Sequence, residues 1–354
     1  MKTSPQNETQ VRRKPRSFPL LLLVLLSLIF TISCKEKPIE QPEKVFENGI
    51  FILNEGNFQG GNSSLSFLHQ PGDSLSHKIF RTALGRPLGD VAQSIQIRQD
   101  KAWIVVNNSG KIEVIDLPKL DPHCTISGLI SPRYLHFISA NKAYVTDLYS
   151  RNIAIIDPQN CTVTGHISTG GWTEAILAAE NKIFVAQMGT DKILVIDPIT
   201  DLLLDSISVG REPNSLVRAA NGQIWVLCSG GLSEAMPKLL QINPLTHVVT
   251  AGATFSNINE SPNRLRINAA GDRLYWLNTD VYTQLADSND VQSRLISAGS
   301  RTFYGLEIAS TSGELSVLNA RDYVQAGELL QFSASGQALG SYGTGIIPST
   351  LVYY

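Results

Sequence analysis

From residue 49 onward, the chain alternates short apolar runs with turns that are rich in Gly, Asn, Asp and Ser. The runs are rich in β-branched residues, as at 102–107, 143–147 and 192–197. Such runs predict β-strands, and no long helical period appears in this part of the chain. The pattern therefore predicts an all-β domain.

One short element recurs along this domain. It begins with a Pro, aromatic or small residue, continues with two polar positions and then places an aliphatic residue at the start of a strand. The seven copies span residues 92–97, 132–137, 172–177, 213–218, 262–267, 303–308 and 348–353. Counted at the fourth position, from Ile95 to Leu351, successive copies lie 40 to 49 residues apart. A period of about 40 to 50 residues is typical of the four-stranded blades of β-propellers.

The two ends of the domain indicate how the array closes. Residues 49–54 read as a second strand with no first strand before it, whereas residues 348–354 read as a first strand with no second strand after it. We therefore expect the C-terminal strand to complete the opening blade, so that no inner edge stays unpaired. The prediction is a seven-bladed β-propeller with four antiparallel strands per blade, covering residues 49–354.

The first 33 residues have the three parts of a secretory signal. A basic stretch that includes Arg12 precedes a nearly continuous apolar run at 18–32, and Ser33 stands directly before Cys34. The run is shorter than the roughly 20 residues that cross a bilayer as a helix. A cysteine in this position resembles the lipobox of bacterial lipoproteins, although Thr31 stands where an aliphatic residue is usual. We predict a signal peptide at 1–33, lipidation at Cys34 and a charged tether at 34–48; a soluble periplasmic protein or an uncleaved anchor are the alternatives.

The charge of the chain argues against nucleic acid as a partner. The full sequence has a formal net charge of −2. Residues 1–33 carry five basic side chains and one acidic side chain, so the chain without them has a net charge of −6. An acidic protein without a basic stripe is a poor partner for phosphate backbones.

In a propeller, the loops between second and third strands open on the same face as the loops between fourth and first strands. Here this face collects aromatic, amide and arginine side chains, whereas the opposite face has mostly short turns. Such groups suit a large, flat ligand that bears amides. The candidate ligand-binding residues are Asn54, Asn57, Phe58, Arg86, Asn107, Asn108, Arg133, Tyr149, Trp172, Gln187, Arg211, Arg264, Tyr282, Tyr304 and Tyr323.

Several of these residues also have a purely structural explanation. Trp172 and Tyr304 precede first strands, where a ring can plug the central channel. The four arginines recur near the same blade junction, where an ion pair between blades is an equal alternative. The asparagines can satisfy the backbone of their own loops. The remaining aromatic candidates are expected in loops with little core to fill, namely Phe58, Tyr149, Tyr282 and Tyr323.

Catalytic motifs are absent from the sequence. The six histidines are scattered without metal-ligand spacing, and neither a GxSxG motif nor a phosphate-binding glycine loop occurs. We therefore predict a protein that is not an enzyme and has no metal or cofactor of its own. Besides Cys34, Cys228 is expected in a buried strand. Cys124 and Cys161 both precede a fourth strand in adjacent blades, which leaves a disulfide between them open.

Two resemblances narrow the class of protein. The segment AYVTD at 143–147 resembles the YVTN-type repeat of a broad family of β-propellers, which implies that fold for the whole domain. The segments FILNEGNFQGGNSSLSF (51–67), GRPLGDVAQS (85–94), AYVTDLYSRNIAIID (143–157) and STGGWTEAI (168–176) resemble the BtuG-type surface lipoproteins of Bacteroidetes. The second resemblance is dense up to about residue 215 and weaker beyond it.

The BtuG-type resemblance implies a lipid-anchored protein of the outer membrane, exposed at the cell surface. It further implies binding of cobalamin (vitamin B12) or a related corrinoid, as a transported ligand, and delivery to a TonB-dependent outer-membrane transporter. Two other classes stay open. A propeller enzyme of the lactonase or lyase type needs charged side chains that converge at the channel mouth, and a protein-interaction scaffold needs a protein partner.

Overall fold

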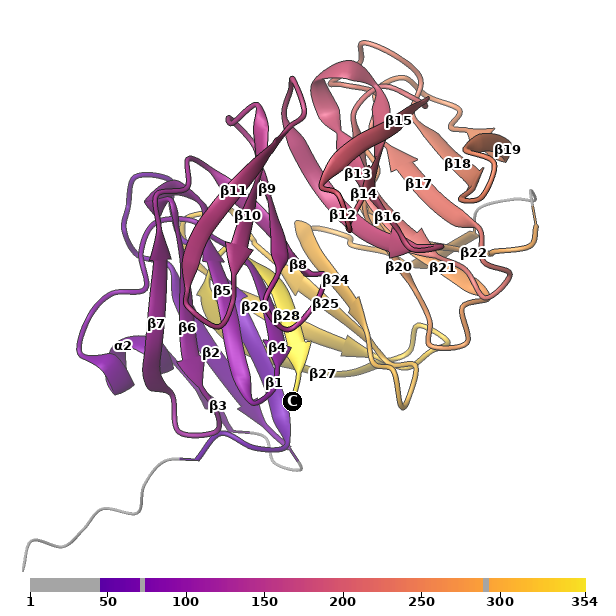
Figure 1. Ribbon diagram of the computed structural model, residues 1–354. Coiled ribbons are helices and arrows are strands. Elements are labelled where there is room, and N and C mark those ends of the chain that lie inside the picture. The colour runs from indigo at the N-terminus through magenta and orange to yellow at the C-terminus, as the bar shows by residue number, and fades with distance from the viewer. Residues whose placement is uncertain (1–44, 71–73, 289–292) are drawn as a thin grey trace, which may run out of the picture. The chain divides into compact units, whose positions relative to one another are not determined.

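The computed structural model describes residues 45–70, 74–288 and 293–354 (Figure 1). These residues form seven four-stranded antiparallel sheets, which confirms the predicted seven-bladed β-propeller. The predicted signal peptide, Cys34 and the tether up to residue 44 lie outside the described residues. Within the described ranges, no helix has the length and apolar character needed to cross a membrane.

Each blade has four strands that follow one another from the channel outward. From its innermost strand outward, the first blade comprises β28 (Pro348–Tyr353), β1 (Gly49–Asn54), β2 (Ser64–His69) and β3 (Leu75–Ser76). The second comprises β4 (Ala92–Arg98), β5 (Lys101–Val106), β6 (Lys111–Asp116) and β7 (Asp121–Ser127). The third comprises β8 (Pro132–Phe137), β9 (Ala143–Asp147), β10 (Asn152–Asp157) and β11 (Thr162–Ser168).

The remaining four blades follow the same order. The fourth comprises β12 (Thr173–Ala179), β13 (Lys182–Gln187), β14 (Lys192–Asp197) and β15 (Leu202–Ser208). The fifth comprises β16 (Pro213–Arg218), β17 (Ile224–Cys228), β18 (Lys238–Asn243) and β19 (Val248–Thr254). The sixth comprises β20 (Asn263–Ile267), β21 (Arg273–Asn278), β22 (Asp280–Leu285) and β23 (Ser293–Ile296). The seventh comprises β24 (Phe303–Ile308), β25 (Leu315–Asn319), β26 (Ala326–Phe332) and β27 (Ala338–Ile346).

The C-terminal strand closes the ring as the sequence predicts. β28, yellow in Figure 1, pairs antiparallel with β1, in indigo, although the two strands stand at opposite ends of the domain. β28 also contacts the inner strands β4 and β24 on either side, and every other inner strand contacts the inner strand of the next blade. The seven predicted first strands are thus the seven inner strands, with starts that agree to within one residue.

The apolar runs of the second strands are continuous because each blade is buried on both of its faces. Side chains alternate along β1: Ile50 and Ile52 pack toward the seventh blade, whereas Phe51 and Leu53 pack toward the second, near Ile104. The seven apolar clusters of the described chain all lie between two successive blades in this way. A strand with a core on both sides needs apolar residues at every position rather than at every second one.

One helical segment is not anticipated by the sequence pattern. The fourth strand of the first blade, β3, has only two residues, and the chain then forms the short helix α2 (Ile79–Leu84) before β4. Ile79 and Phe80 are buried in the cluster between the first and second blades. The two apolar residues therefore fill space beside the short β3, and six residues are too few to produce a recognisable helical period.

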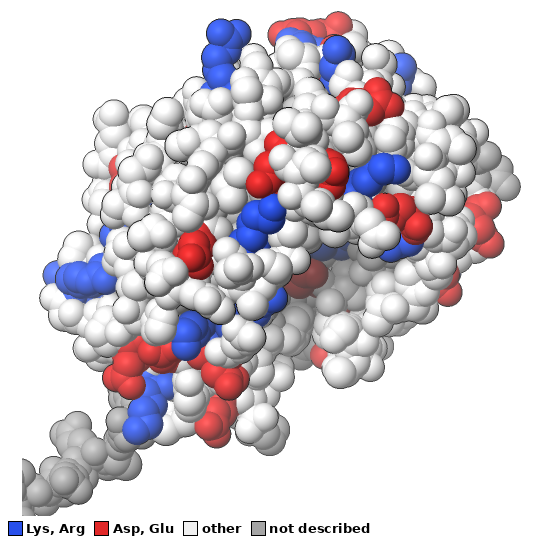
Figure 2. Space-filling model, viewed as in Figure 1, with Lys and Arg blue, Asp and Glu red and all other residues white. Residues whose placement is uncertain are grey.

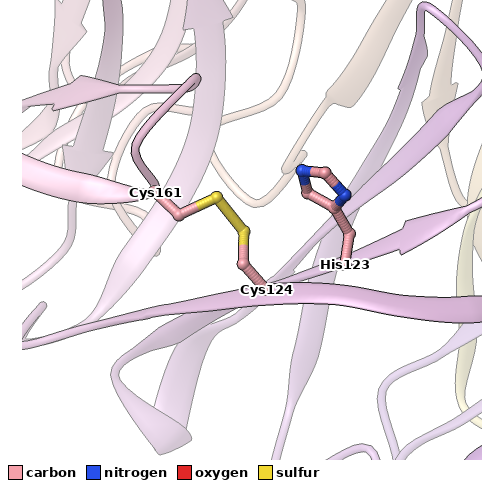
Figure 3. A group of neighbouring side chains, drawn as sticks. All are labelled: His123, Cys124 and Cys161. Carbon is pink, nitrogen blue, oxygen red and sulfur yellow. A yellow bond between two sulfur atoms is a disulfide. The ribbon is translucent and has the colours of Figure 1, made fainter.

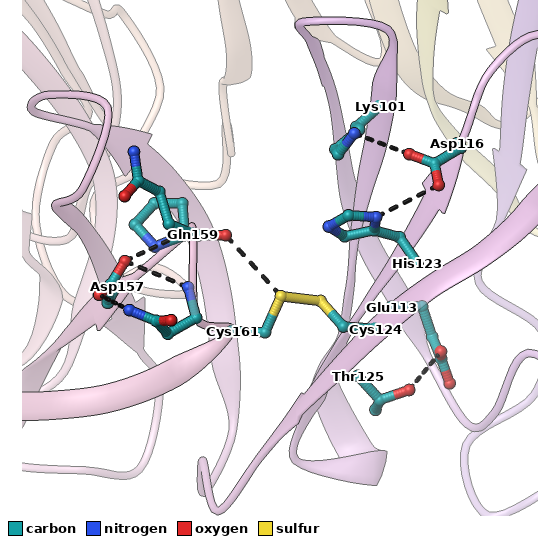
Figure 4. Close-up of a disulfide and its surroundings, with 11 residues drawn as sticks. Lys101, Glu113, Asp116, His123, Cys124, Thr125, Asp157, Gln159 and Cys161 are labelled. Carbon is teal, nitrogen blue, oxygen red and sulfur yellow. Dashed lines mark hydrogen bonds and ion pairs between the residues drawn. A yellow bond between two sulfur atoms is a disulfide. The ribbon is translucent and has the colours of Figure 1, made fainter.

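A disulfide joins the outer parts of the second and third blades. Cys124 lies in β7, and Cys161 directly precedes β11; their sulfur atoms are bonded, and their Cα atoms lie 6.5 Å apart (Figures 3 and 4). The possibility that the sequence left open is therefore realised. Blades spread apart with distance from the axis, so a covalent link at this radius holds two outer strands together. Cys228 is buried as predicted, and burial raises the pKa of its thiol to about 12.

We expect replacement of both Cys124 and Cys161 by serine to lower the free energy of unfolding by about 2–4 kcal/mol. The bond closes a loop of 37 residues, so losing it increases the entropy of the unfolded chain. The measurement is urea unfolding of the wild type and the double variant under oxidising conditions. A reducing agent should shift the midpoint of the wild type only. Equal midpoints for the oxidised wild type and the variant would contradict the prediction.

Candidate functional site

All seven inner strands carry a β-bulge near their first residue. In each blade, the register between the inner strand and its neighbour shifts by one residue at this point. A bulge re-aims the side chains of its strand. Each bulge contains at least one of the two polar positions of the sequence repeat, and the polar residues in the bulges are Gln93, Arg133, Tyr134, Glu174, Asn214, Arg264, Tyr304 and Ser349. These residues gather at one end of the central channel, which we call the channel mouth.

An ion pair between neighbouring blades occupies one side of the channel mouth. The guanidinium group of Arg133 donates two hydrogen bonds to the carboxylate of Glu174, at 2.7 and 2.6 Å, and a third to Oε1 of Gln93, at 2.5 Å. Both charged side chains are largely buried. Burial lowers the pKa of Arg133, but attraction to Glu174 outweighs this effect and raises the pKa overall. The two side chains therefore occupy each other across the boundary between the third and fourth blades.

A second charged group at the channel mouth, Arg264, makes longer contacts with its neighbours. Arg264 donates from Nε to the carbonyl oxygen of Tyr304 at 3.1 Å, and its guanidinium group lies 5.5 Å from the centre of the Tyr304 ring. Its Nη2 atom lies 3.9 Å from Oε1 of Glu55. The hydroxyl group of Tyr304 donates to Oε2 of Glu55 at 3.1 Å. Burial raises the pKa of Glu55, and the nearby positive charge of Arg264 offsets this only in part.

These side chains line a cavity of about 460 Å³. Its walls come from inner strands of five blades and from nearby loops: Arg133, Tyr134, Leu148, Glu174, Met188, Asn214, Ser215, Asn263, Arg264, Phe303, Tyr304 and Tyr323. The volume is within the range of about 300–1,000 Å³ that small-molecule pockets occupy. A polar cavity with buried charges on its walls can receive one polar substituent of a larger ligand.

Four exposed aromatic side chains form what we call the aromatic rim. Tyr323 lines the cavity, Tyr149 directly follows Leu148 of its wall, and Trp172 directly precedes β12. Phe58 follows Asn57, which bonds the carbonyl oxygen of Tyr323. The exposed fractions are 69% for Phe58, 63% for Tyr149, 48% for Trp172 and 43% for Tyr323. Tyr149 and Trp172 form an edge-to-face pair with ring centres 6.1 Å apart, and Tyr323 packs edge-on against Tyr304 at 5.6 Å. Exposed aromatic groups beside a polar cavity are typical of binding surfaces, because they offer large apolar area at little cost in side-chain entropy.

Residues 48–337 match the family described as "Domain of unknown function (DUF5074)". The chain belongs to this DUF5074 family. No curated protein matches the sequence. Among solved structures, a quinonprotein alcohol dehydrogenase-like protein from Bacteroides thetaiotaomicron is similar, with a TM-score of 0.70, 14% identity and coverage of 88% of this chain and 79% of that one. The periplasmic gluconolactonase of Pseudomonas aeruginosa has a TM-score of 0.66 and 13% identity over 86% of this chain and 98% of that one.

These likenesses concern the fold of the DUF5074 chain. A putative 6-phosphogluconolactonase from Bacteroides fragilis is a third similar structure, with a TM-score of 0.64, 12% identity and coverage of 88% of this chain and 99% of that one. The YVTN-type resemblance and these structures agree on a propeller. At this level of identity, the function must be argued from the site of the DUF5074 chain itself.

Four of the predicted site residues are held by hydrogen bonds within the protein, and two of them, Asn54 and Asn107, bond across a boundary between blades. Asn54 is fully buried and bonds Ser64, Ser66 and the backbone N–H of Gly345. The other three bond similarly: Asn107 to Ser131 and Pro132, Asn108 to Asp90, and Gln187 to Thr169 and Thr190. Their amide groups fix the loops of the DUF5074 domain. Asn57 links two blades, because its Nδ2 atom donates to the carbonyl oxygen of Tyr323 at 2.7 Å.

The four predicted arginines separate into two groups. Arg133 and Arg264 reach the channel mouth, whereas Arg86 and Arg211 do not. Arg86 forms a two-pronged pair with the buried Glu113 of β6, at 2.8 Å for each contact. Arg211 pairs with Asp191 and Glu234 beside a different surface recess. Only the arginines placed in bulges of inner strands therefore face the cavity.

The prediction that Tyr282 lies in a loop is wrong. It lies in β22, and its ring stacks on the buried Trp276 with ring centres 6.1 Å apart. The turn between β21 and β22 consists of Thr279 alone, with Asn278 and Asp280 paired across it. This turn is much shorter than the segment suggested, so the chain has already re-entered the sheet at Tyr282.

Four polar residues at the channel mouth are not among the site residues predicted from the sequence. Glu55 directly follows the strand predicted at 49–54, whereas Gln93, Tyr134 and Glu174 fall in copies of the repeat. The two polar positions of the repeat are the feature of the sequence that could have predicted these last three residues. Polar residues recur where a strand would otherwise need apolar ones, and this indicates side chains turned away from the sheet by a bulge.

Two carboxylates, Glu55 and Glu174, thus lie at the channel mouth, which is the arrangement that a hydrolytic propeller requires. Glu174 is engaged by Arg133 through both oxygen atoms. Glu55 accepts a hydrogen bond from the hydroxyl group of Tyr304 and faces Arg264. Neither carboxylate therefore stands free to act as a general base, and no histidine is among the residues that line the cavity.

Two further places in the described chain bring polar or charged side chains together. A cavity of about 430 Å³ lies beside α2, but its only charged side chains, Lys78 and Arg81, come from one short segment rather than from several blades. His123, Cys124 and Cys161 place potential metal ligands within 4.8 Å of one another (Figure 3). The disulfide leaves neither sulfur as the thiolate that a metal needs. His123 also contacts Asp116, which pairs with Lys101 (Figure 4).

Proposed function

We propose that this DUF5074 protein is a non-catalytic binding protein that captures cobalamin or a related corrinoid on the channel-mouth face. The observation that carries the proposal is the aromatic rim, which leaves four large rings exposed around a polar cavity. The corrin ring system is broad, has apolar faces and is surrounded by amide groups. Its faces suit aromatic side chains, and its amides suit the polar groups of the cavity.

The dimensions of the site support a ligand that lies across the mouth. A cavity of about 460 Å³ accepts a substituent rather than a whole corrinoid. The rings of Tyr149, Trp172 and Tyr323 stand at its edge, where they can contact the remainder of the ligand. Bulges of the inner strands hold the polar side chains of the cavity wall in place before binding, so these side chains need little ordering when the ligand arrives.

The proposal includes the place of the protein in the cell. The signal at 1–33, with Cys34 directly after it, supports a lipid-anchored protein of the outer membrane. The BtuG-type resemblance supports exposure at the cell surface and transfer of the corrinoid to a TonB-dependent transporter. Charge supports a small-molecule cargo rather than nucleic acid: Lys and Arg are interspersed with Asp and Glu on the face shown in Figure 2, without a basic stripe.

Titration calorimetry of the protein without residues 1–33 tests the proposal. We expect cobalamin at micromolar concentrations to give saturable heat. Trp172→Ala should weaken binding by about tenfold or more, because aromatic anchors at an interface often contribute at least 2 kcal/mol. The control is Ile199→Ala: Ile199 is 86% exposed in the turn between β14 and β15, on the opposite face, and its loss should change nothing. Absence of heat with the wild type would exclude the proposal.

A further inference from the structure

Arg264 is the most incompletely bonded charge at the channel mouth. A guanidinium group has five N–H donors. Among the described residues, Nε bonds the carbonyl oxygen of Tyr304 at 3.1 Å, and Nη1 makes a long contact of 3.5 Å with the hydroxyl of Tyr134. Nη2 approaches Glu55 only to 3.9 Å, beyond hydrogen-bond distance. The side chain is only 14% exposed, so it cannot be satisfied as an arginine at an open surface would be.

Arg133, which lines the same cavity, differs from Arg264 because its guanidinium group has close hydrogen-bond partners. It makes two short bonds to Glu174 and one to Gln93, so three of its donors are occupied by partners within the protein. Arg264 has no such partner on its own side of the mouth. It also adopts a left-handed backbone conformation, with φ of +57°, inside the bulge of β20. Strained positions of this kind cluster at ligand-binding sites.

Glu55 does not balance the charge of Arg264 at all pH values. Its carboxyl group is buried, and burial raises its pKa. The charged and titratable groups that face it are Arg264 from β20, Tyr304 from β24 and Arg133 from β8. Burial raises the pKa of Tyr304, and both arginines have a raised pKa. These three groups keep one charge state around neutral pH, so Glu55 is the member that titrates.

We propose that Arg264 binds an anionic oxygen group of the ligand, such as a phosphodiester, at the channel mouth. The anion replaces the distant carboxyl group of Glu55 as the partner of Nη2 and also contacts Nη1. Glu55 takes up a proton in exchange, and the hydroxyl groups of Tyr134 and Tyr304 lie beside the same space. The inference deepens the proposed function, because the nucleotide tail of cobalamin carries a phosphodiester.

The anion and the Glu55 carboxylate compete for Arg264, so the affinity for the anion should depend on pH. The bound anion favours the protonated form of Glu55, so binding raises the pKa of Glu55 further. Affinity is therefore highest below the pKa of Glu55 in the free protein and falls as the pH rises through it. A site in which Glu55 had no part would show no such change.

Methanesulfonate is a suitable probe, because it is a tetrahedral monoanion whose charge is constant across the pH range used. Dimethyl sulfone has nearly the same shape without the charge, and it serves as the matched neutral probe. Saturation-transfer NMR on the methyl group of each compound reports weak binding, and added sulfate should displace methanesulfonate. We expect methanesulfonate to bind the wild-type protein better at about pH 5 than at about pH 8, and dimethyl sulfone to bind at neither pH.

Variants separate the roles of the two residues. Arg264→Gln should weaken methanesulfonate binding by about tenfold or more, since it removes a charge-assisted contact. Arg218→Gln removes the same charge at the far end of β16, where Arg218 pairs with Glu180, and should leave binding unchanged. Glu55→Gln should retain binding and lose the pH dependence. This third variant keeps the test decisive even if Arg264→Gln does not fold.

Three results would overturn the inference: equal binding of dimethyl sulfone, binding that persists in Arg264→Gln, or a wild-type affinity that does not fall between the two pH values. Failure of the proposed function is distinguishable from these. If methanesulfonate binds as expected but cobalamin gives no heat, the anion site stands and the corrinoid proposal falls. If cobalamin binds but methanesulfonate does not, the reverse holds.

Discussion

Removal of the last seven residues, 348–354, is expected to abolish cooperative folding of the domain. The deletion takes away β28, which forms the inner edge of the first blade through its pairing with β1 and contacts β4 and β24. It exposes the apolar side of β1 and removes the buried Leu351. The loss is comparable to the whole stability of a typical domain, about 5–15 kcal/mol. The exposed edge of β1 should also promote aggregation.

Circular dichroism during heating and size-exclusion chromatography measure this effect. Two variants of full length provide the comparison. Leu351→Ala should cost about 2–5 kcal/mol, as expected for a buried leucine. Leu339→Ala on the outer strand β27, where the side chain is 55% exposed, should cost no more than about 0.5 kcal/mol. A shortened protein that melts at the temperature of the wild type would show that the ring is not closed by β28.

Replacement of Arg133 by methionine is expected to destabilise the protein by about 3–5 kcal/mol. The change leaves the carboxylate of Glu174 buried without its partner, and only 6% of that side chain is exposed. Urea unfolding measures the difference in free energy. In the double variant Arg133→Met and Glu174→Leu, most of the stability should return, because no charge is then left buried without a partner.

The exposed pair Arg218 and Glu180 provides the matched control, because Arg218→Met should cost less than about 1 kcal/mol. Equal effects of the two arginine substitutions would contradict the view that burial of the Arg133 pair determines its contribution. Loss of the pair should also disturb the cavity wall, because Arg133 connects three blades through Gln93 and Glu174.

The similar structures illustrate why the fold alone does not decide the function. They include a gluconolactonase and a dehydrogenase-like protein, and all share the propeller with this chain at 12–14% identity. In such folds the scaffold is common and the chemistry is set by the residues at the channel mouth. Here both carboxylates at the mouth have partners, whereas Arg264 is incompletely bonded. This arrangement is the basis of the proposed recognition of an anionic group.

The sequence by itself determined the architecture. Seven copies of one inner strand set the number of blades, and the unpaired elements at 49–54 and 348–354 predicted the closure between β1 and β28. These features could be predicted because each blade repeats the same local pattern of turns and apolar strands, and that pattern depends on neighbours close in sequence. The same reasoning placed Trp172, Tyr149 and Tyr323 on one face.

Only the tertiary structure decided which of these residues form the site. Tyr304 and Glu55 are 249 residues apart in the chain, and they meet because the ring brings the first and seventh blades together. The bulges turn Arg264 toward the cavity, whereas Arg86 lies outside them and pairs with Glu113. Whether a polar side chain serves a loop, an ion pair or a ligand depends on partners across the channel. Those partners come from other blades, and no local pattern along the chain specifies them.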